Sequence, residues 1–301
     1  MTAAAEAASA MSRPAFEFDV EDVTYITHGD KPLLARLYRP RGAGPFPVMI
    51  DLHGGAWCNQ DRTNDVVICE ALARSGVLVV ALDFRMPPDA GYPASLADIN
   101  FAIRWVRANA GRLKARADRI GTIGISSGGH QSMLAAMRPA DQRYSAIATA
   151  EVPKGDARLQ CVVLLWPVID PLGRYRYGKE AIASGRLAEF PQQLPNVIPS
   201  HDKFWGSEAA MEEGSPPEIL AKGEKVELPP VLYVQGDADR MHPRPHLDRF
   251  VELYRKRGCA LELALYPGEV EGFVTRQAKS EANKQAATER IIAFVHRTLG
   301  G

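Results

Sequence analysis

Residues 119–130 read Arg-Ile-Gly-Thr-Ile-Gly-Ile-Ser-Ser-Gly-Gly-His, and a helical pattern rich in alanine begins at Gln131. The β-branched residues predict a buried strand, and the small residues after them predict a sharp turn into the helix. Gly124 to Gly128 fit the pattern G-x-S-x-G, in which glycines relieve crowding and lift the serine oxygen above the end of a sheet. The pattern therefore indicates Ser126 as a nucleophile. The alternative is a solvent-facing serine at a glycine-rich helix start.

The same alternation of strand and helix continues on both sides of this stretch. Apolar runs predict buried strands, amphipathic stretches predict helices, and an uneven alternation near the start predicts an antiparallel pair. The antiparallel pair covers 16–26 and 33–38, the buried strands cover 48–52, 77–82, 161–166, 231–234 and 261–266, and the main helices cover 65–75, a long segment from residue 93, and 282–298. This order predicts an α/β fold with a mostly parallel central sheet, helices on both faces, and a site at the carboxyl ends of the strands.

The chain is long enough for one large domain. It has 301 residues, of which 46% are hydrophobic, so it can bury a full core. We expect residues 1–15 to form a flexible tail and residues 16–301 to form the α/β domain. The periodicity fades between about residues 170 and 229, where Pro and Gly alternate with bulky aromatics. This segment is predicted to be a cap insert that folds over the strand ends.

The charge balance and the cysteine content limit the classes of molecule that we expect this protein to bind. Lys plus Arg and Asp plus Glu both number 36, which leaves no basic field for nucleic acid or anionic lipid. The four cysteines lie far apart without C-x-x-C spacing, which disfavours a zinc site and a disulfide framework. No apolar run is long enough to span a bilayer, and the start lacks a signal-peptide pattern. We therefore expect a cytoplasmic protein that acts on a small molecule without a metal or other cofactor, and we leave homo-oligomer formation open.

Three further motifs accompany the serine motif along the chain. They are His53-Gly-Gly-Ala-Trp57, Gly236-Asp-Ala-Asp239-Arg-Met-His-Pro243 and Tyr266-Pro-Gly-Glu-Val-Glu-Gly-Phe273. In this order and at these spacings, the four motifs resemble the hormone-sensitive-lipase-like esterase family of the α/β-hydrolase fold, from roughly residue 16 to the end. The resemblance implies a serine hydrolase that acts on a small carboxylic ester or a related acyl compound, with a covalent acyl-enzyme.

The resemblance also implies an oxyanion hole next to the nucleophile. The H-G-G segment, Gly54 to Ala56, would supply the backbone N–H groups of Gly55 and Ala56. The N–H group of Ser127, directly after the nucleophile, would complete the hole. Glycine at these positions lets the backbone approach a substrate closely.

The predicted acid and base include one departure from the family pattern. Asp239 matches the position of the family's triad acid after the penultimate strand, and Asp237 is a weaker candidate. Glu271 stands where the family has its general-base histidine. We expect Asp239 and Glu271 to share a proton in a partly dry cleft and to replace the usual acid–base pair.

Another histidine is the alternative source of the base, because imidazole is the usual proton acceptor for a serine hydroxyl. His242 is close in sequence to the predicted acid, His130 lies one helical turn beyond the nucleophile, and His201 and His246 lie in or near the insert. No motif selects any of them, so we expect each to be structural or solvent-facing. His53 is expected to hold its own loop in place.

Two other classes of function stay open. In a lyase or isomerase, the oxyanion hole would stabilise an enolate or a leaving oxyanion, Glu271 would move the proton, and Ser126 would only donate a hydrogen bond. In a binding protein, the pocket would persist without turnover. A natural or engineered change of histidine to glutamate at residue 271 would also leave an impaired enzyme.

Bulky aromatics are the candidates for the walls of the substrate pocket. They are Trp57, Trp166, Phe204 and Trp205. The alternative for each is ordinary packing in the core or in the insert. The sequence does not reveal which small molecule is the substrate.

Overall fold

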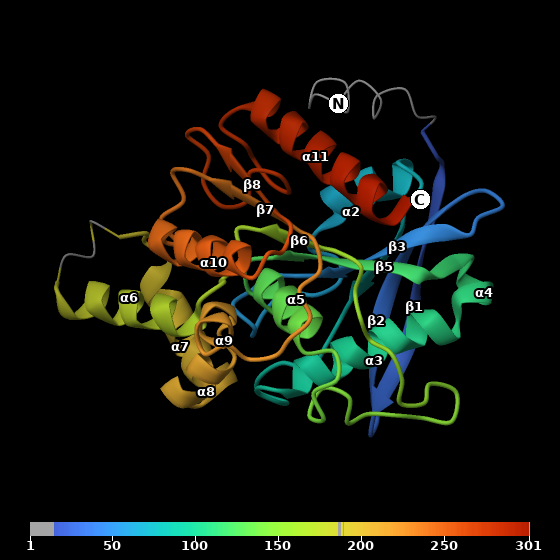
Figure 1. Cartoon of the computed structure of the whole chain (residues 1–301), viewed down its shortest axis with the longest axis horizontal. Helices are drawn as coiled ribbons and strands as arrows, with labels where there is room; N and C mark the ends of the chain where they lie inside the picture. Colours follow the sequence, from blue (N-terminus) through green and yellow to red (C-terminus); the bar gives the residue numbers. More distant parts are fainter. Residues whose placement is uncertain (1–14, 186–187, 189, 301) are drawn as a thin grey trace.

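The computed structural model describes residues 15–185, 188 and 190–300 and contains one eight-stranded sheet (Figure 1). Its strands are β1 (Phe18–His28), β2 (Lys31–Pro40), β3 (Phe46–Leu52), β4 (Leu78–Leu82), β5 (Ala115–Ile125), β6 (Val162–Leu165), β7 (Val231–Gly236) and β8 (Leu261–Tyr266). They lie in the order β1-β2-β4-β3-β5-β6-β7-β8. The pairs β1–β2 and β2–β4 are antiparallel and the other pairs are parallel, which confirms the predicted mostly parallel sheet. Except for Ala15, the predicted tail lies outside the described residues.

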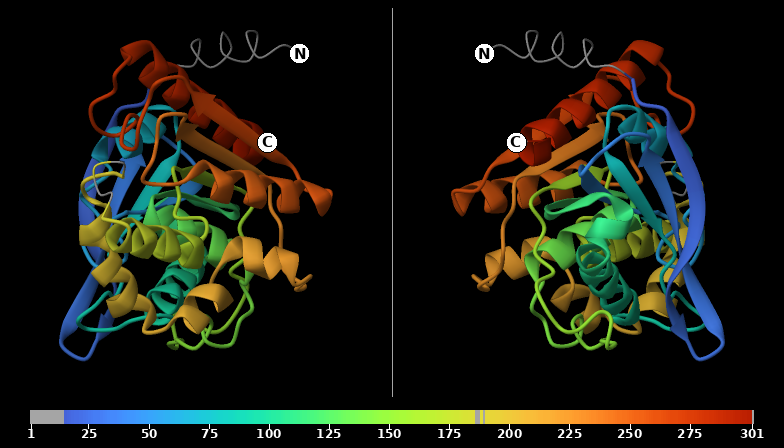
Figure 2. Two further views of the ribbon diagram at one scale, coloured as in Figure 1. Left: turned by 90° about the vertical axis from the view of Figure 1, so that its left-hand side faces the viewer. Right: turned by 90° about the vertical axis from the view of Figure 1, so that its right-hand side faces the viewer.

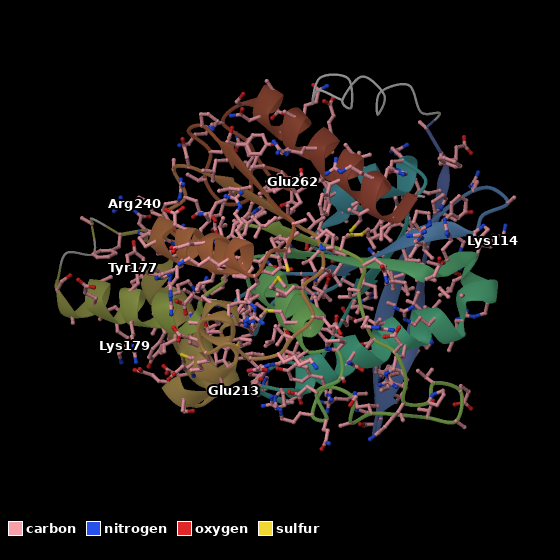
Figure 3. All side chains as sticks on the ribbon, viewed as in Figure 1. Lys114, Tyr177, Lys179, Glu213, Arg240 and Glu262 are labelled. Atoms are coloured by element: carbon pink, nitrogen blue, oxygen red, sulfur yellow. The ribbon has the colours of Figure 1, made fainter. Side chains whose placement is uncertain are left out.

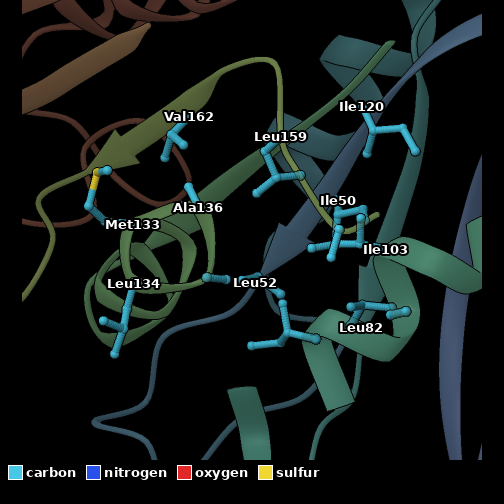
Figure 4. Close-up of a cluster of buried hydrophobic side chains, with 14 of the residues drawn as sticks. Ile50, Leu52, Leu82, Ile103, Ile120, Met133, Leu134, Ala136, Leu159 and Val162 are labelled. Carbon is cyan, nitrogen blue, oxygen red and sulfur yellow. The ribbon is translucent and has the colours of Figure 1, made fainter. Parts of the chain in front are cut away.

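Helices cover both faces of the sheet (Figure 2). They are α2 (Val66–Arg74), α3 (Ala94–Ala108), α4 (Ala110–Leu113), α5 (Ser127–Met137), α10 (Arg244–Lys256), α11 (Glu281–Val295) and the π-helical turn η2 (His296–Gly300). Side chains of β3 alternate between two cores, as the pleat of a strand requires. Ile50 and Leu52 pack with Ile103 of α3 and Met133 of α5 (Figure 4), whereas Met49 packs on the opposite face with α2 and α11.

The parallel register brings the ends of the central strands to one edge of the sheet. Leu52 of β3 pairs with Gly124 of β5, and Ile125 pairs with Leu165 of β6. Gly236 of β7 pairs with Tyr266 of β8. The loops that follow β3, β5, β7 and β8 carry the predicted site residues, and they therefore leave the sheet at the same edge.

The described part of the segment between β6 and β7 contains four α-helices joined by irregular stretches. Its helices are α6 (Pro171–Ala183), α7 (Leu194–Trp205), α8 (Glu208–Glu213) and α9 (Pro216–Ala221), and they gather at one end of the molecule (Figure 1). Trp57, from the loop after β3, stacks on Phe204 of α7 with ring centroids 5.5 Å apart. Tyr177 of α6 donates a hydrogen bond to the carbonyl of Arg240, after β7, at 3.4 Å (Figure 3). The helices are thus attached to two of the loops at the carboxyl edge of the sheet.

All four cysteines, Cys58, Cys69, Cys161 and Cys259, are free thiols. Within the described part of the chain, every helix is too short or too polar to cross a membrane.

Candidate active site

Ser126 lies in the sharp turn between β5 and α5 that the sequence predicted. Its backbone has φ of 53° and ψ of −115°, a conformation that L-residues rarely adopt and that marks a strained functional turn. A Cβ on Gly124 would lie 2.4 Å from the carbonyl oxygen of Gly128, and one on Gly128 would lie 1.9 Å from that of Leu52. Both glycines of the motif are therefore required for the close packing that presents the serine.

His242 makes a direct hydrogen-bond contact with Ser126. The distance between His242 Nε2 and Ser126 Oγ is 3.1 Å, and the distance between His242 Nδ1 and Asp239 Oδ2 is 2.9 Å. The side chains of His242 and Asp239 are only 2% and 1% exposed. With the proton on Nδ1 donated to Asp239, Nε2 is free to accept the serine proton, which is the arrangement of a serine–histidine–aspartate triad.

A tight turn positions this pair. The second oxygen of the Asp239 carboxylate, Oδ1, accepts the backbone N–H groups of Met241 at 2.8 Å and His242 at 3.1 Å. The side chain of Gln235 on β7 donates to the carbonyl of His242 at 2.8 Å. One loop therefore carries both the aspartate and the histidine, and its own hydrogen bonds orient the ring.

The predicted pairing of Asp239 with Glu271 as acid and base is wrong in its geometry. Glu271 lies beside the ring of His242, with Oε2 4.0 Å from Nδ1, and its side chain is 32% exposed. Among the described residues it makes no hydrogen bond to Ser126 or to Asp239. The reason is spatial: His242 already occupies the position between Ser126 and Asp239 that the glutamate would have needed.

The expectation that His242 is structural or solvent-facing is wrong, because its ring contacts both Ser126 and Asp239. His130 and His201, by contrast, are buried in packing contacts. His130 contacts the Trp57 indole nitrogen at 3.3 Å and the carbonyl of Gly214 at 2.8 Å, and burial lowers its pKa to about 4. Burial and the nearby Arg174 lower the pKa of His201 to about 2. His53 contacts the carbonyl of Gly54 at 3.1 Å, which confirms that it holds its own loop.

The H-G-G segment forms an unusual backbone loop beside Ser126. Gly55, Ala56 and Trp57 have φ values of 88°, 51° and 62°, and a Cβ on Gly55 would lie 2.0 Å from the carbonyl oxygen of Asn59. The N–H of Trp57 donates to Ser127 Oγ at 3.1 Å and so ties this loop to the turn of the nucleophile. Within the described part of the chain, the N–H groups of Gly55 and Ala56 have no hydrogen-bond acceptor. They are thus free to bind a ligand atom.

A cavity of about 360 Å³ opens next to Ser126. The sheet loops contribute Gly54, Gly55, Ala56 and Glu271 to its lining, and the helical segment contributes Arg174, Gln193, Asn196, Val197 and Ser200. Both layers therefore border the same space. Sequence reasoning did not find these lining residues of the insert, because no motif marks them and their helical pattern is irregular.

Three of the four predicted wall aromatics do not reach this cavity. Trp57, Phe204 and Trp205 are 0%, 2% and 4% exposed and pack against one another. Their large apolar surfaces attach the insert to the sheet instead of facing a ligand. Trp166 does line the cavity, and its ring also packs against Phe273, with centroids 5.6 Å apart.

Comparison with known proteins agrees with this fold. The BD-FAE family model matches residues 36–252, and the chain belongs to this family. This confirms the resemblance to hormone-sensitive-lipase-like esterases of the α/β-hydrolase fold. The chain is 28% identical to Esterase LipC of Mycobacterium tuberculosis over 91% of its own length and 65% of LipC.

Two further relatives extend the comparison. Ethyl acetate hydrolase of Pseudomonas putida is 27% identical over 85% of this chain and 76% of its own length. A hyperthermophilic esterase from the archaeon Pyrobaculum calidifontis superposes with a TM-score of 0.73 at 23% identity, over 97% of this chain and 86% of that one. The likeness to the solved structure shows the shared fold.

Proposed function

We propose that this protein hydrolyses small carboxylic esters through an acyl-enzyme formed on Ser126. The observation that carries the proposal is the continuous hydrogen-bond chain from Ser126 Oγ through His242 to Asp239. The names of the relatives, an esterase and an ethyl acetate hydrolase, support the same chemistry. The lyase or isomerase alternative relied on Glu271 as the proton carrier beside Ser126, but in the described part of the chain His242, and not Glu271, makes the hydrogen bond to Ser126 Oγ.

Each group has a defined task in the proposed reaction. Ser126 Oγ attacks the ester carbonyl while His242 Nε2 takes its proton, and Asp239 stabilises the imidazolium. The imidazolium then gives that proton to the departing alcohol. A water molecule attacks the acyl group with His242 again as the base, which releases the carboxylic acid and restores the serine.

The oxyanion would be bound by backbone N–H groups. Those of Gly55 and Ala56 have no other acceptor among the described residues, and that of Ser127 belongs to the first turn of α5, where the helix dipole favours negative charge. We further propose that the segment around residues 170–229 acts as a cap, because five of its residues line the cavity that contains Ser126.

Hydrolysis of p-nitrophenyl butyrate, combined with labelling by a fluorophosphonate, tests the proposal. Wild type should turn over the ester and gain one phosphonyl group on the peptide that contains Ser126, as measured by mass spectrometry. Ser126→Ala should lose the label and at least about ten-thousand-fold in kcat. A label on another residue, or full activity of Ser126→Ala, would show that Ser126 is not the nucleophile.

A further inference from the structure

The most unusual side chain in the cavity is Arg174 of α6. It is buried, with 2% of its surface exposed, yet it lines the same cavity as Ser126. Among the described residues no carboxylate lies within 4.0 Å of its guanidinium, although buried arginines are normally paired. Its Nη2 atom is buried without a hydrogen-bond partner.

The neighbours of Arg174 hold it in place without offsetting its charge. Its Nε donates to His201 Nε2 at 3.4 Å, and the guanidinium carbon lies 5.4 Å from the centre of the Trp57 ring. His201 Nδ1 contacts the carbonyl of Val197 at 3.1 Å, which assigns its proton to Nδ1 and leaves Nε2 as a neutral acceptor. The histidine and the indole therefore orient the guanidinium and supply no negative charge.

Arg174 nevertheless stays a cation at neutral pH. Burial lowers its pKa, opposed by the charges of Glu271 and Asp239, and the pKa is about 10. Asp239 is already occupied by His242 and by two backbone N–H groups. Glu271 is partly exposed, so solvent screens its effect.

The charged side chains that line the cavity, Arg174 included, add up to an excess of positive charge. They are Arg174, Arg276 and Glu271, so the lining carries a net charge of +1. Arg276 is exposed, whereas Arg174 is buried. A desolvated guanidinium with a free donor is the group that binds a ligand carboxylate most strongly.

We infer that Arg174 forms a subsite for a carboxylate, and that the protein prefers esters that carry a free carboxylate, such as the half-esters of dicarboxylic acids. This inference rests on the proposed ester hydrolysis. It goes beyond that function because it assigns a charge to the substrate and a specificity role to a residue of the insert.

Paired esters that differ only in charge test the subsite. We would compare kcat/KM for monoethyl adipate with that for diethyl adipate. The same comparison with monoethyl and diethyl suberate, which have a longer carbon chain, varies the distance between the ester and the free carboxylate. Wild type should favour the half-ester at least about ten-fold in one pair, through a lower KM. A preference for the neutral diester in both pairs would overturn the inference.

Two single variants test whether the preference for half-esters depends on Arg174. Arg174→Met should reduce the half-ester to diester ratio about ten- to a hundred-fold. The matched control is Arg176→Met on the same helix, since Arg176 is exposed and pairs with Glu208 at 2.8 Å, and its ratio should equal that of wild type. An unchanged ratio in Arg174→Met would contradict the subsite.

Inhibition of wild type gives a readout that does not depend on the folding of a variant. Adipate should compete with p-nitrophenyl butyrate at least about ten-fold better than adipamide, its uncharged analogue. Equal inhibition by the two would contradict the inference. Loss of ester hydrolysis altogether would instead refute the proposed function, whereas hydrolysis that depends on Ser126 without a preference for anions would refute only the subsite.

Discussion

The loops after β7 and β8 both carry carboxylates at the edge of the site, but the structure uses them differently. In the β7 loop, Asp239 accepts two backbone N–H groups and the ring of His242, and both residues are buried. In the β8 loop, the carboxylate that is firmly held is Glu269, which accepts the N–H groups of Lys279 and Ser280 and is 0% exposed. Glu271 has a side chain that is 32% exposed, and it makes no hydrogen bond within the described chain. A motif position therefore does not fix the geometry of a side chain, whereas a network of hydrogen bonds does.

Among the replacements in the two loops, that of His242 in the β7 loop should lower kcat the most. His242→Ala should lower kcat about ten-thousand-fold or more, since Ser126 would lose the imidazole that is hydrogen-bonded to its Oγ. Steady-state ester hydrolysis measures the effect, and thermal unfolding checks that the variant is folded. Activity close to wild type would transfer the role of base to the β8 loop.

Asp239→Asn should have the next largest effect. The amide cannot stabilise the imidazolium as a carboxylate does, so kcat should fall about a thousand- to ten-thousand-fold. The matched control is Asp237→Asn, since Asp237 is exposed and accepts only the N–H of Gly268, at 2.7 Å, and should change kcat by less than about three-fold. An equal loss of kcat in the two variants would mean that removing any negative charge from the β7 loop lowers activity, and that Asp239 has no specific role.

Glu271→Gln should have a much smaller effect than either. Its carboxylate lies 4.0 Å from His242 Nδ1 and favours the imidazolium formed in the transition state, but solvent screens it. We expect kcat to fall by about three- to ten-fold, measured with the same ester. A loss as large as that of His242→Ala would restore Glu271 as an essential catalytic group and refute the contrast between the loops.

A third buried carboxylate, Asp65 before α2, should affect stability and not activity. Burial raises its pKa from 3.8 to about 7, so the folded state holds the proton more tightly than the unfolded state does. The stability that this group contributes is therefore lost as pH rises between these two values. Asp65→Asn should remove that loss and raise the melting temperature more at pH 8 than at pH 5, with kcat within about two-fold of wild type. An equal shift at both pH values would show that the carboxylate does not change its protonation on folding.

The sequence determined much of the fold and the centre of the site. Strand and helix patterns depend on which face of each element is buried, so the runs around β3, β5 and β7 predicted a parallel sheet without knowledge of their neighbours. The Ser126 turn and the Gly55 loop were also predictable, because their glycines meet local backbone constraints. Both lie where Cβ atoms would clash with nearby carbonyls.

Tertiary structure alone decided which histidine contacts Ser126 and which charged side chains line the pocket. Several histidines were candidates, and the choice of His242 depends on a distance of 3.1 Å across 116 positions of the chain, which no local pattern encodes. Proximity to Asp239 was the only signal, and it becomes decisive only when the two N–H bonds to that carboxylate orient the ring. Likewise, Arg174 looks like an ordinary helical arginine until the packing of Trp57 and Phe204 brings the insert over the sheet edge. The described part of the insert then removes solvent from the guanidinium of Arg174 without placing a carboxylate beside it. The sequence cannot reveal this, because desolvation depends on everything that surrounds a group in space and not on its neighbours in sequence.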